Sequence, residues 1–199
     1  VVYVIKEQTI IALIGVNDIV RENAKEVISK LKQKQIQTIM LTGDNKQTAE
    51  TIANQLGITK VIANILPSEK ANIIKELKQE GNYVMMCGDG INDSPALANS
   101  DIGVSVQSGT DIAMDSSEVI LTKNDLNSIL NLIQISEKTV RTIKQNLFWA
   151  FFYNLLMIPI AIGFLKPIGI SINPMIASLA MVFSSLTVIL NTLRLKRKI

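Results

Sequence analysis

Residues 84–97 hold the side chains of this chain that are best suited to chemistry. They read Val-Met-Met-Cys-Gly-Asp-Gly-Ile-Asn-Asp-Ser-Pro-Ala-Leu, an apolar strand followed at once by Asp89, Asn92 and Asp93. Ligands of open α/β sheets bind at such strand ends, and Mg²⁺ prefers carboxylate oxygens while it bridges to phosphate. The run indicates a site for Mg²⁺ and a phosphoryl group, although an ordinary turn has the same residue types.

A second group of polar residues follows another apolar strand. Thr42, Gly43 and Asp44 come directly after Thr-Ile-Met-Leu, and Lys70 follows Pro67 near the start of a helix. A hydroxyl and backbone N–H groups can hold phosphate oxygens, and a lysine can neutralise their charge. Phosphoryl transfer requires mainly positioning and electrostatics, so these parts suit it. Taken singly, Thr42 could be a helix cap and Lys70 a surface lysine, but their order and strand-end placement favour a joint site.

The elements that must position these residues alternate between strands and helices. Short apolar runs predict the strands, and apolar residues at helical spacing predict the helices. Such alternation is typical of an α/β fold with a parallel sheet and helices on both faces. The predicted strands are 2–5, 10–14, 37–41, 61–63, 83–87, 102–106 and 119–121, and the predicted helices are 18–34, 45–56, 68–80, 94–99, 110–114 and 125 to about 144.

The apolar residues are concentrated in the last third of the chain, which has 199 residues and is 48% hydrophobic. No charged residue occurs from Phe148 to Leu165 or from Pro167 to Leu193, and Lys166 is the only charge between these stretches. Each stretch can supply the roughly 20 apolar residues that a membrane-spanning helix needs. The pattern predicts a two-helix transmembrane hairpin with a very short outer connection.

The positive charge flanks this hairpin. The formal net charge is +3, and the tail after Leu193 contains four cationic residues, so the basic balance does not indicate a nucleic-acid surface. Positive residues gather on the cytoplasmic side of membrane spans. We therefore expect a multi-pass protein of the cell membrane, with the soluble part and both ends of the hairpin in the cytoplasm. The flanking cations are Lys138, Arg141, Lys144, Arg194, Lys196, Arg197 and Lys198.

Cysteine and histidine limit the available chemistry. Cys87 is the only cysteine, so neither a disulfide nor a Cys-x-x-Cys metal site can form within the chain. Its place in an apolar strand predicts a buried, inert thiol. The chain has no histidine, which removes the commonest metal ligand and general base.

The motifs together resemble those of a known family. Thr42-Gly43-Asp44, Pro67 with Lys70, and the run from Gly88 to Asp93 resemble the phosphorylation domain of P-type ATPases, which has the haloacid-dehalogenase fold. In the apolar stretches, Tyr153-Asn154, Met181 and Ser184-Ser185 resemble the signature of the copper(I)-transporting branch of the heavy-metal class. The resemblance covers nearly the whole chain. It implies a haloacid-dehalogenase-like doubly wound parallel sheet followed by the transmembrane hairpin.

The resemblance also implies a role for each motif residue. Thr42 and Lys70 would contact an aspartyl phosphate, with Gly43 and Asp44 in the same catalytic set, and Asn92 would contact the phosphate. Asp89 would hold Mg²⁺, with Asp93 beside it. The ion path would include Tyr153, Asn154, Met181 and Ser185. ATP and Mg²⁺ are the implied cofactors, Cu(I) the transported substrate, and membrane lipid and a copper chaperone the further partners; no nucleic acid is implied.

The chain departs from the full family pattern because it contains no Asp-Lys-Thr-Gly-Thr and no Cys-Pro-Cys. The nucleophilic aspartate and the entry thiolates are thus absent, and in the family both precede the segment matched by Val1. We expect the carboxyl-terminal portion of a longer copper(I) export pump. Its expected parts are the end of the nucleotide-binding domain with re-entry strands (1–16), the phosphorylation domain (17–125), a linking helix (126–146), two transmembrane helices (147–166 and 172–193) and a basic tail (194–199).

Three questions stay open. Met181 and Ser185 are one helical turn apart, and a soft thioether in a charge-free path suits a monovalent soft ion better than Zn²⁺, but Ag(I) fits as well as Cu(I). Serine and asparagine in spans also serve helix–helix hydrogen bonding. The alternatives to a pump are a catalytically silent membrane module that needs a separate partner, and a membrane-tethered phosphatase, which would also need the absent aspartate.

Overall fold

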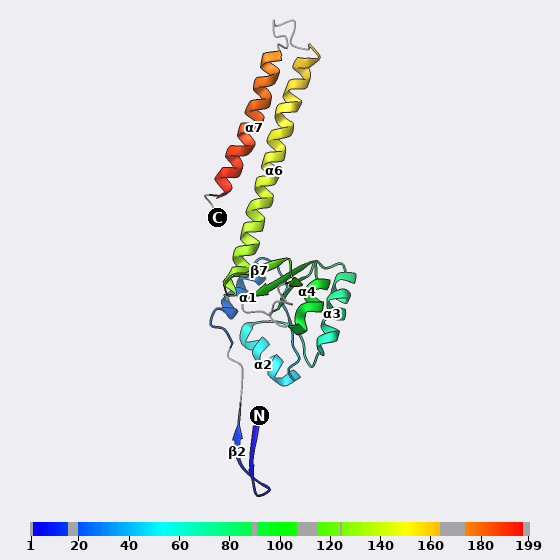
Figure 1. Ribbon diagram of the computed structural model, residues 1–199, viewed down its shortest axis with the longest axis vertical. Helices are drawn as coiled ribbons and strands as arrows, with labels where there is room; N and C mark the ends of the chain where they lie inside the picture. The colour runs from blue at the N-terminus through cyan, green and yellow to red at the C-terminus, as the bar shows by residue number, and fades with distance from the viewer. Residues whose placement is uncertain are drawn as a thin grey trace. The chain divides into compact units, whose positions relative to one another are not determined.

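The computed structural model describes residues 2–15, 20–88, 91–106, 115–123, 125–163 and 174–196. It divides into two compact units, Val1–Leu130 and Asn131–Ile199. The strands are β1 (Val2–Lys6), β2 (Thr9–Ile14), β3 (Ile39–Leu41), β4 (Lys60–Ile62), β5 (Met85–Gly88), β6 (Ile102–Val106) and β7 (Val119–Leu121). The helices are α1 (Ala24–Gln33), α2 (Lys46–Leu56), α3 (Pro67–Gln79), the 3₁₀ turn η1 (Ile91–Asp93), α4 (Ser94–Asn99), α6 (Asn127–Ala161) and α7 (Pro174–Lys196) (Figure 1).

The strands of the first unit form parallel ladders, as the alternation of strands and helices predicted. β5, β6 and β7 make a three-stranded parallel sheet in which Met86 is opposite Gly103 and Val104 is opposite Val119. β3 and β4 make a second parallel pair. The predicted single sheet is therefore present as two ladders in the described part of the chain, where no pairing joins β3 to β5. β1 and β2 form an antiparallel hairpin.

The core of the first unit lies between the strands and the helices that follow them. Ile74 of α3, Met86 of β5 and Ala96 and Leu97 of α4 form one buried cluster, and Leu41 of β3 packs against it. Leu97 has no exposed surface, and burying such a side chain stabilises the fold by roughly 1.5–3 kcal/mol. This cluster holds the segments that follow β3 and β5 on one packed scaffold.

The ends of α2 and α3 follow the capping signals of the sequence. The Asn45 side chain accepts a hydrogen bond of 2.9 Å from the Thr48 N–H, which satisfies a free donor at the start of α2. Gly57 ends this helix with a left-handed φ of 77°, which glycine adopts without strain. At the start of α3, the Glu69 side chain accepts a hydrogen bond of 2.8 Å from the Leu66 N–H.

The helix predicted over 18–34 is shorter than expected. α1 begins at Ala24, and residues 16–19 lie outside the described ranges. The preceding residues form a turn in which the Ala24 N–H bonds the Arg21 carbonyl. The Asn23 amide also donates to the Asp125 carboxylate, a contact between residues far apart in sequence, and this tertiary bond fixes the turn ahead of the helix. The predicted helix at 110–114 lies outside the described residues.

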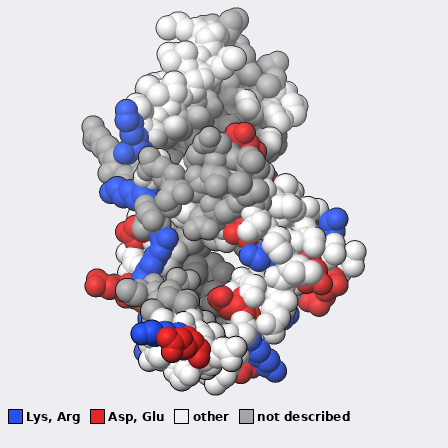
Figure 2. Space-filling model, turned by 60° about the horizontal axis from the view of Figure 1, so that its bottom comes forward, with Lys and Arg blue, Asp and Glu red and all other residues white. Residues whose placement is uncertain are grey.

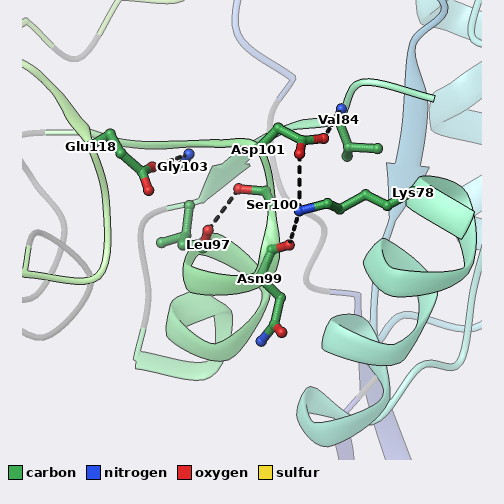
Figure 3. A network of polar contacts seen from close by, with 8 residues as sticks. All are labelled: Lys78, Val84, Leu97, Asn99, Ser100, Asp101, Gly103 and Glu118. Atoms are coloured by element: carbon green, nitrogen blue, oxygen red, sulfur yellow. Dashed lines mark hydrogen bonds and ion pairs between the residues drawn. The ribbon is translucent and has the colours of Figure 1, made fainter. Parts of the chain in front are cut away.

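A polar network ties the end of α3 to the starts of β5 and β6 (Figure 3). The Lys78 ammonium lies 3.0 Å from the Asp101 carboxylate and donates to the Asn99 carbonyl at 3.1 Å. The other Asp101 oxygen accepts a hydrogen bond of 2.8 Å from the Val84 N–H. The bond from Val84, followed by the one from Lys78, lowers the pKa of the Asp101 carboxyl, since both favour its charged form.

The strands that end near the predicted site keep part of their surface accessible. β3 and β4 are half-buried along their length, and Cys87 of β5 is exposed. The prediction of a buried Cys87 is therefore wrong, since the residue keeps exposed surface in the described part of the chain. Enough protein atoms still surround the thiol that desolvation raises its pKa to about 11. Strands in parallel sheets are ordinarily covered on both faces, so this degree of exposure is unusual.

The second unit is a pair of helices. α6 and α7 lie side by side, joined by hydrogen bonds from the Asn191 amide to Asn146 at 2.8 Å and from the Asn146 amide to Thr192 at 2.9 Å. Within the described residues, one helical segment, Ser178–Lys196, is long and apolar enough to cross a membrane.

On the face shown in Figure 2, acidic and basic side chains are interspersed and form no single-sign patch.

Candidate functional site

The loop after β3 is held by the side chains predicted for chemistry. The Thr42 hydroxyl donates a hydrogen bond of 2.8 Å to the Asp44 carboxylate and accepts one of 3.1 Å from the Asp44 N–H. The Asp44 carbonyl in turn accepts from the Asn64 N–H at 2.9 Å. A Cβ built on Gly43 would meet only the Ile65 carbonyl oxygen, at 3.4 Å, so the loop has room beside this glycine. The three residues form a fixed turn with a polar, accessible rim.

The loop after β5 is joined to α3 by an ion pair. The Lys70 ammonium lies 2.7 Å from the Asp93 carboxylate, and the two side chains are only 15% and 14% exposed. Lys70 is in the first turn of α3, and Asp93 ends the 3₁₀ turn that leads into α4. A cation and a carboxylate shielded from water interact more strongly than an exposed pair, so this contact orders the loop.

The absence of a side chain at Gly88 leaves the space that the Asp93 side chain occupies. A Cβ built on Gly88 would lie 2.7 Å from both the Cβ and one carboxylate oxygen of Asp93. Only a residue without a side chain leaves this space, because β5 and the following turn approach so closely. The glycine that the sequence places at the strand end is thus a steric requirement of the carboxylate's position.

The chemistry of these residues fits a magnesium–phosphate site. Asp93 is a hard oxygen donor, and its carboxylate fills the space that a Gly88 side chain would take. The hydroxyl of the adjacent Ser94 is buried and has no hydrogen-bond partner among the described residues. Asn92 is exposed and open to a ligand. Asp89, the residue predicted to hold Mg²⁺, lies outside the described residues together with Gly90. Within the described part of the chain no cluster of three acidic or thiol side chains forms a complete metal site.

The structure brings some predicted residues together and leaves others separate. Thr42 contacts Asp44, and Lys70 contacts Asp93. Among the described residues, no hydrogen bond or ion pair joins the first pair to the second. Their connection runs instead through the core, where Leu41, the residue before Thr42, packs on the same cluster as Met86 of β5.

The residues predicted for an ion path do not meet one another within the helical pair. The hydroxyls of Tyr153 and Thr187 share a hydrogen bond of 3.2 Å across α6 and α7. Asn154 donates to the Ala150 carbonyl of its own helix at 2.9 Å and is exposed. Met181 is 75% exposed, and Ser185, one turn further along α7, is exposed as well. Asn154, Met181 and Ser185 are therefore exposed, whereas Tyr153 is half-buried and bonds across the two helices.

Sequence reasoning expected asparagine in the spans to serve helix–helix hydrogen bonding, as Asn191 does, but it missed the partners that connect α6 to α7. Thr187 bonds Tyr153, and Asn146 bonds both Asn191 and Thr192. A signal was available, because Thr187 and Asn191 are four residues apart and therefore share a helix face. Asn146 was overlooked since it lies just before the charge-free stretch.

Comparison with known proteins gives concordant results. The family model described as haloacid dehalogenase-like hydrolase matches residues 1–101. A copper-exporting P-type ATPase of Legionella pneumophila is 49% identical over 188 residues, which cover 94% of this chain and 26% of the relative. A probable copper-importing P-type ATPase A of Enterococcus hirae is 46% identical over 201 residues, covering 100% of this chain and 27% of the relative.

Solved structures show the same fold. A zinc-transporting PIB-type ATPase in the E2.Pi state is 30% identical, with a TM-score of 0.84 over 97% of this chain and 31% of the other. The catalytic domain of the CPx-ATPase CopB-B is 38% identical, with a TM-score of 0.56 over 59% of this chain and 46% of the other.

The chain spans about a quarter of the length of the curated relatives it matches. The family model covers half of the chain, and the relatives cover nearly all of it. The chain therefore belongs to the haloacid dehalogenase-like hydrolase family, and its resemblance to the copper-transporting P-type ATPases, predicted from its motifs, is confirmed.

Proposed function

We propose that this chain is the carboxyl-terminal portion of an ATP-driven copper(I) export pump that works through a phospho-aspartate intermediate. The observation that carries the proposal is the Lys70–Asp93 ion pair of 2.7 Å packed against Gly88 at the end of β5. This pair presents a cation and a carboxylate together at a strand end, where phosphate and Mg²⁺ would both be held. The copper-transporting relatives supply the substrate class.

Each side chain would contribute one part of phosphoryl transfer. Lys70 would neutralise the charge of the phosphoryl oxygens, and the Thr42 hydroxyl, which now donates to Asp44, would donate to one of them. Asp89 and Asp93 would hold Mg²⁺, which supplies charge neutralisation when bound. Because Asp93 also pairs with Lys70, Mg²⁺ and the Lys70 ammonium would share the Asp93 carboxylate and hold the loop after β5 in place.

The nucleophilic aspartate would come from polypeptide outside this chain. β3 and β5 have no described strand between them, and Cys87 on β5 is exposed. Both features fit a sheet completed by another segment, which would bring the aspartate to the strand ends beside Thr42 and Asp93. The chain by itself would then be catalytically silent.

The helical pair would form the membrane part of the pump. α7 meets the length and hydropathy of a span, and α6 carries no charged residue from Leu147 to its end at Ala161. Their antiparallel arrangement supports the two-helix hairpin, with both basic ends and the α/β unit in the cytoplasm. Tyr153, Asn154, Met181 and Ser185 would line the ion path once further helices cover their exposed surfaces.

The choice of metal and direction rests on the relatives and on the spans. The copper-transporting relatives from Legionella pneumophila and Enterococcus hirae are 49% and 46% identical, whereas the zinc-transporting structural neighbour is 30% identical. Neither apolar stretch holds a charge that would favour a divalent ion, so Cu(I) or the equally soft Ag(I) fits better. Export is the direction named for the relatives from Legionella pneumophila and Bacillus subtilis, at 49% and 48% identity, and import is the direction named for the relative from Enterococcus hirae, at 46%.

The decisive experiment uses the longer protein that contains this chain, reconstituted in vesicles. ATP hydrolysis is measured with Cu(I) under reducing conditions, with Ag(I) and with Zn²⁺, and copper movement is followed by metal analysis of the vesicle lumen. We expect stimulation by Cu(I) or Ag(I) and none by Zn²⁺. Stimulation by Zn²⁺ alone would refute the proposed substrate. The 199-residue chain serves as the control, and an acid-stable, hydroxylamine-sensitive label on it would refute its silence.

Two variants of the longer protein separate the proposed roles. Asp89→Asn removes a Mg²⁺ ligand and should abolish phosphorylation by ATP. Met181→Ala should leave Mg²⁺ binding intact and weaken activation by copper, while Met175→Ala, a methionine of the same helix outside the proposed path, should have little effect. Equal loss in the two methionine variants would contradict the assignment of Met181 to the path.

A further inference from the structure

One face of α6 combines cations with aromatic rings. Arg141, Lys144, Gln145, Phe148 and Trp149 line a shallow cavity of about 680 Å³. Arg141 and Lys144 are three residues apart, and Lys144 and Phe148 are four apart, so their side chains lie on one helix face. The Phe148 and Trp149 rings contact each other edge to face, with centroids 5.5 Å apart. The cavity thus has a cationic end and an aromatic end along the same helix.

The end of α7 adds positive charge at the same level. Asn191 and Thr192 bond Asn146, and the helices run antiparallel, so each residue further along α7 lies about one residue further back along α6. By this register Arg194 lies level with the turn of Lys144, and Lys196 lies level with that of Arg141. Four cations from two helices therefore gather at one height, beside the point where the charge-free stretch begins.

The cations of the cavity are available to a ligand. Within the described part of the chain, the side chains of Arg141 and Lys144 make no ion pair or hydrogen bond, and Glu137 is the only acidic residue of the cavity. A guanidinium can hold a phosphate through two parallel hydrogen bonds, and an ammonium adds a point charge. Phe148 is 60% exposed, a large apolar surface directly next to these cations.

We propose that this face of α6 is a binding site for the phosphate headgroup of an anionic glycerophospholipid. Arg141 and Lys144 hold the phosphate, Arg194 and Lys196 add to the positive field, and Phe148 and Trp149 pack against the upper acyl chains and glycerol. The inference rests on the proposed membrane location of α6. A lipid fits better than an acidic protein segment, because tryptophan beside a cationic turn is typical of the membrane–water interface.

Trp149 provides a direct test because it is the only tryptophan of the chain. The 199-residue chain is reconstituted in phosphatidylcholine vesicles that contain a fixed low fraction of lipid with brominated acyl chains, which quench nearby tryptophan. The brominated lipid is either phosphatidylglycerol or phosphatidylcholine. We expect stronger quenching by brominated phosphatidylglycerol, with an enrichment of roughly fivefold for each cation near the headgroup. High salt should reduce this selectivity, since it screens the charges.

Variants identify the residues responsible. Arg141→Gln with Lys144→Gln should lower the selectivity by roughly fivefold for each cation removed, leaving the contribution of Arg194 and Lys196. Lys25→Gln with Lys75→Gln removes the same charge from exposed positions of the α/β unit and should leave the selectivity unchanged. Soluble glycerol phosphate should not compete, because the site binds membrane lipid.

The outcomes separate this inference from the proposed function. Equal quenching by the two brominated lipids, with the blue-shifted emission of a membrane-embedded tryptophan, would overturn the lipid site and leave the membrane location standing. Water-like emission without quenching by either lipid would overturn both. Loss of selectivity in the control pair as well would show a general charge effect and also overturn the site.

Discussion

Gly88→Ala should dislodge the Asp93 carboxylate from the loop after β5. The added Cβ would lie 2.7 Å from the Asp93 Cβ, 2.7 Å from one carboxylate oxygen and 2.9 Å from the Cγ. Atoms do not approach this closely, and the Asp93 Cβ is fixed to the backbone, so β5 or the turn must move. Overpacking of this kind costs about 1–3 kcal/mol. Movement of Asp93 would also weaken its ion pair with Lys70, so the lower end of this range is a minimum.

The assay is calorimetric unfolding of the 199-residue chain in detergent. For a unit of this size, a loss of about 1–3 kcal/mol lowers the Tm by roughly 3–15 °C. Gly43→Ala is the matched control, because its Cβ would meet only one atom within 4 Å, the Ile65 oxygen at 3.4 Å. We expect its Tm to stay close to that of the unsubstituted chain.

A double-mutant cycle tests the steric cause directly. Asp93→Gly removes all three atoms that the new Cβ would meet, so Gly88→Ala should cost almost nothing in that background. The coupling between the two substitutions should be about 1–3 kcal/mol. An unchanged Tm for Gly88→Ala, or an equal loss with and without the Asp93 side chain, would refute the reasoning.

Three further outcomes follow from single side chains. Ser94→Ala should be neutral or stabilising in thermal unfolding, because no described residue bonds the buried Ser94 hydroxyl; a clear loss would reveal a bond to this group. The pKa of Asp101 is lowered on folding, so the contribution of its carboxylate to stability is present above pH about 4 and is lost as the pH falls further. The difference in stability between the unsubstituted chain and Asp101→Asn should therefore shrink below that pH. A difference that stays constant would contradict this. The pKa of Cys87 is about 11, so maleimide should label it slowly at pH 8 and about tenfold faster for each pH unit above, whereas a plateau near pH 9 would indicate an ordinary thiol.

Local signals in the sequence predicted the elements well where they act within a few residues. Asn45 and Gly57 bound α2 as expected, and Gly88 marks the end of β5. The start of α1 was missed because it depends on the contact between Asn23 and Asp125, more than a hundred residues apart. A capping pattern cannot report a bond of that kind.

In the candidate site too, the sequence predicted which residues belong together but not the contacts that depend on tertiary packing. The motif order indicated that Lys70 and Asp93 share a site, and the structure places them 2.7 Å apart. The sequence did not indicate that a carboxylate fills the space beside Gly88, since that depends on how closely β5 approaches the turn before α4. It also did not indicate the bond between Tyr153 and Thr187, which requires the register of two helices.

The exposure of Cys87 shows why burial is harder to predict than secondary structure. The apolar run from Val84 to Cys87 has the composition of a strand covered on both faces, and it does form β5. The same composition gives no information on which polypeptide supplies the cover. In the described part of the chain β5 pairs only with β6, and its other edge and the Cys87 side remain open. A strand with a core composition and an open edge indicates that its partner is another segment, and the proposed pump assigns that place to the polypeptide carrying the nucleophilic aspartate.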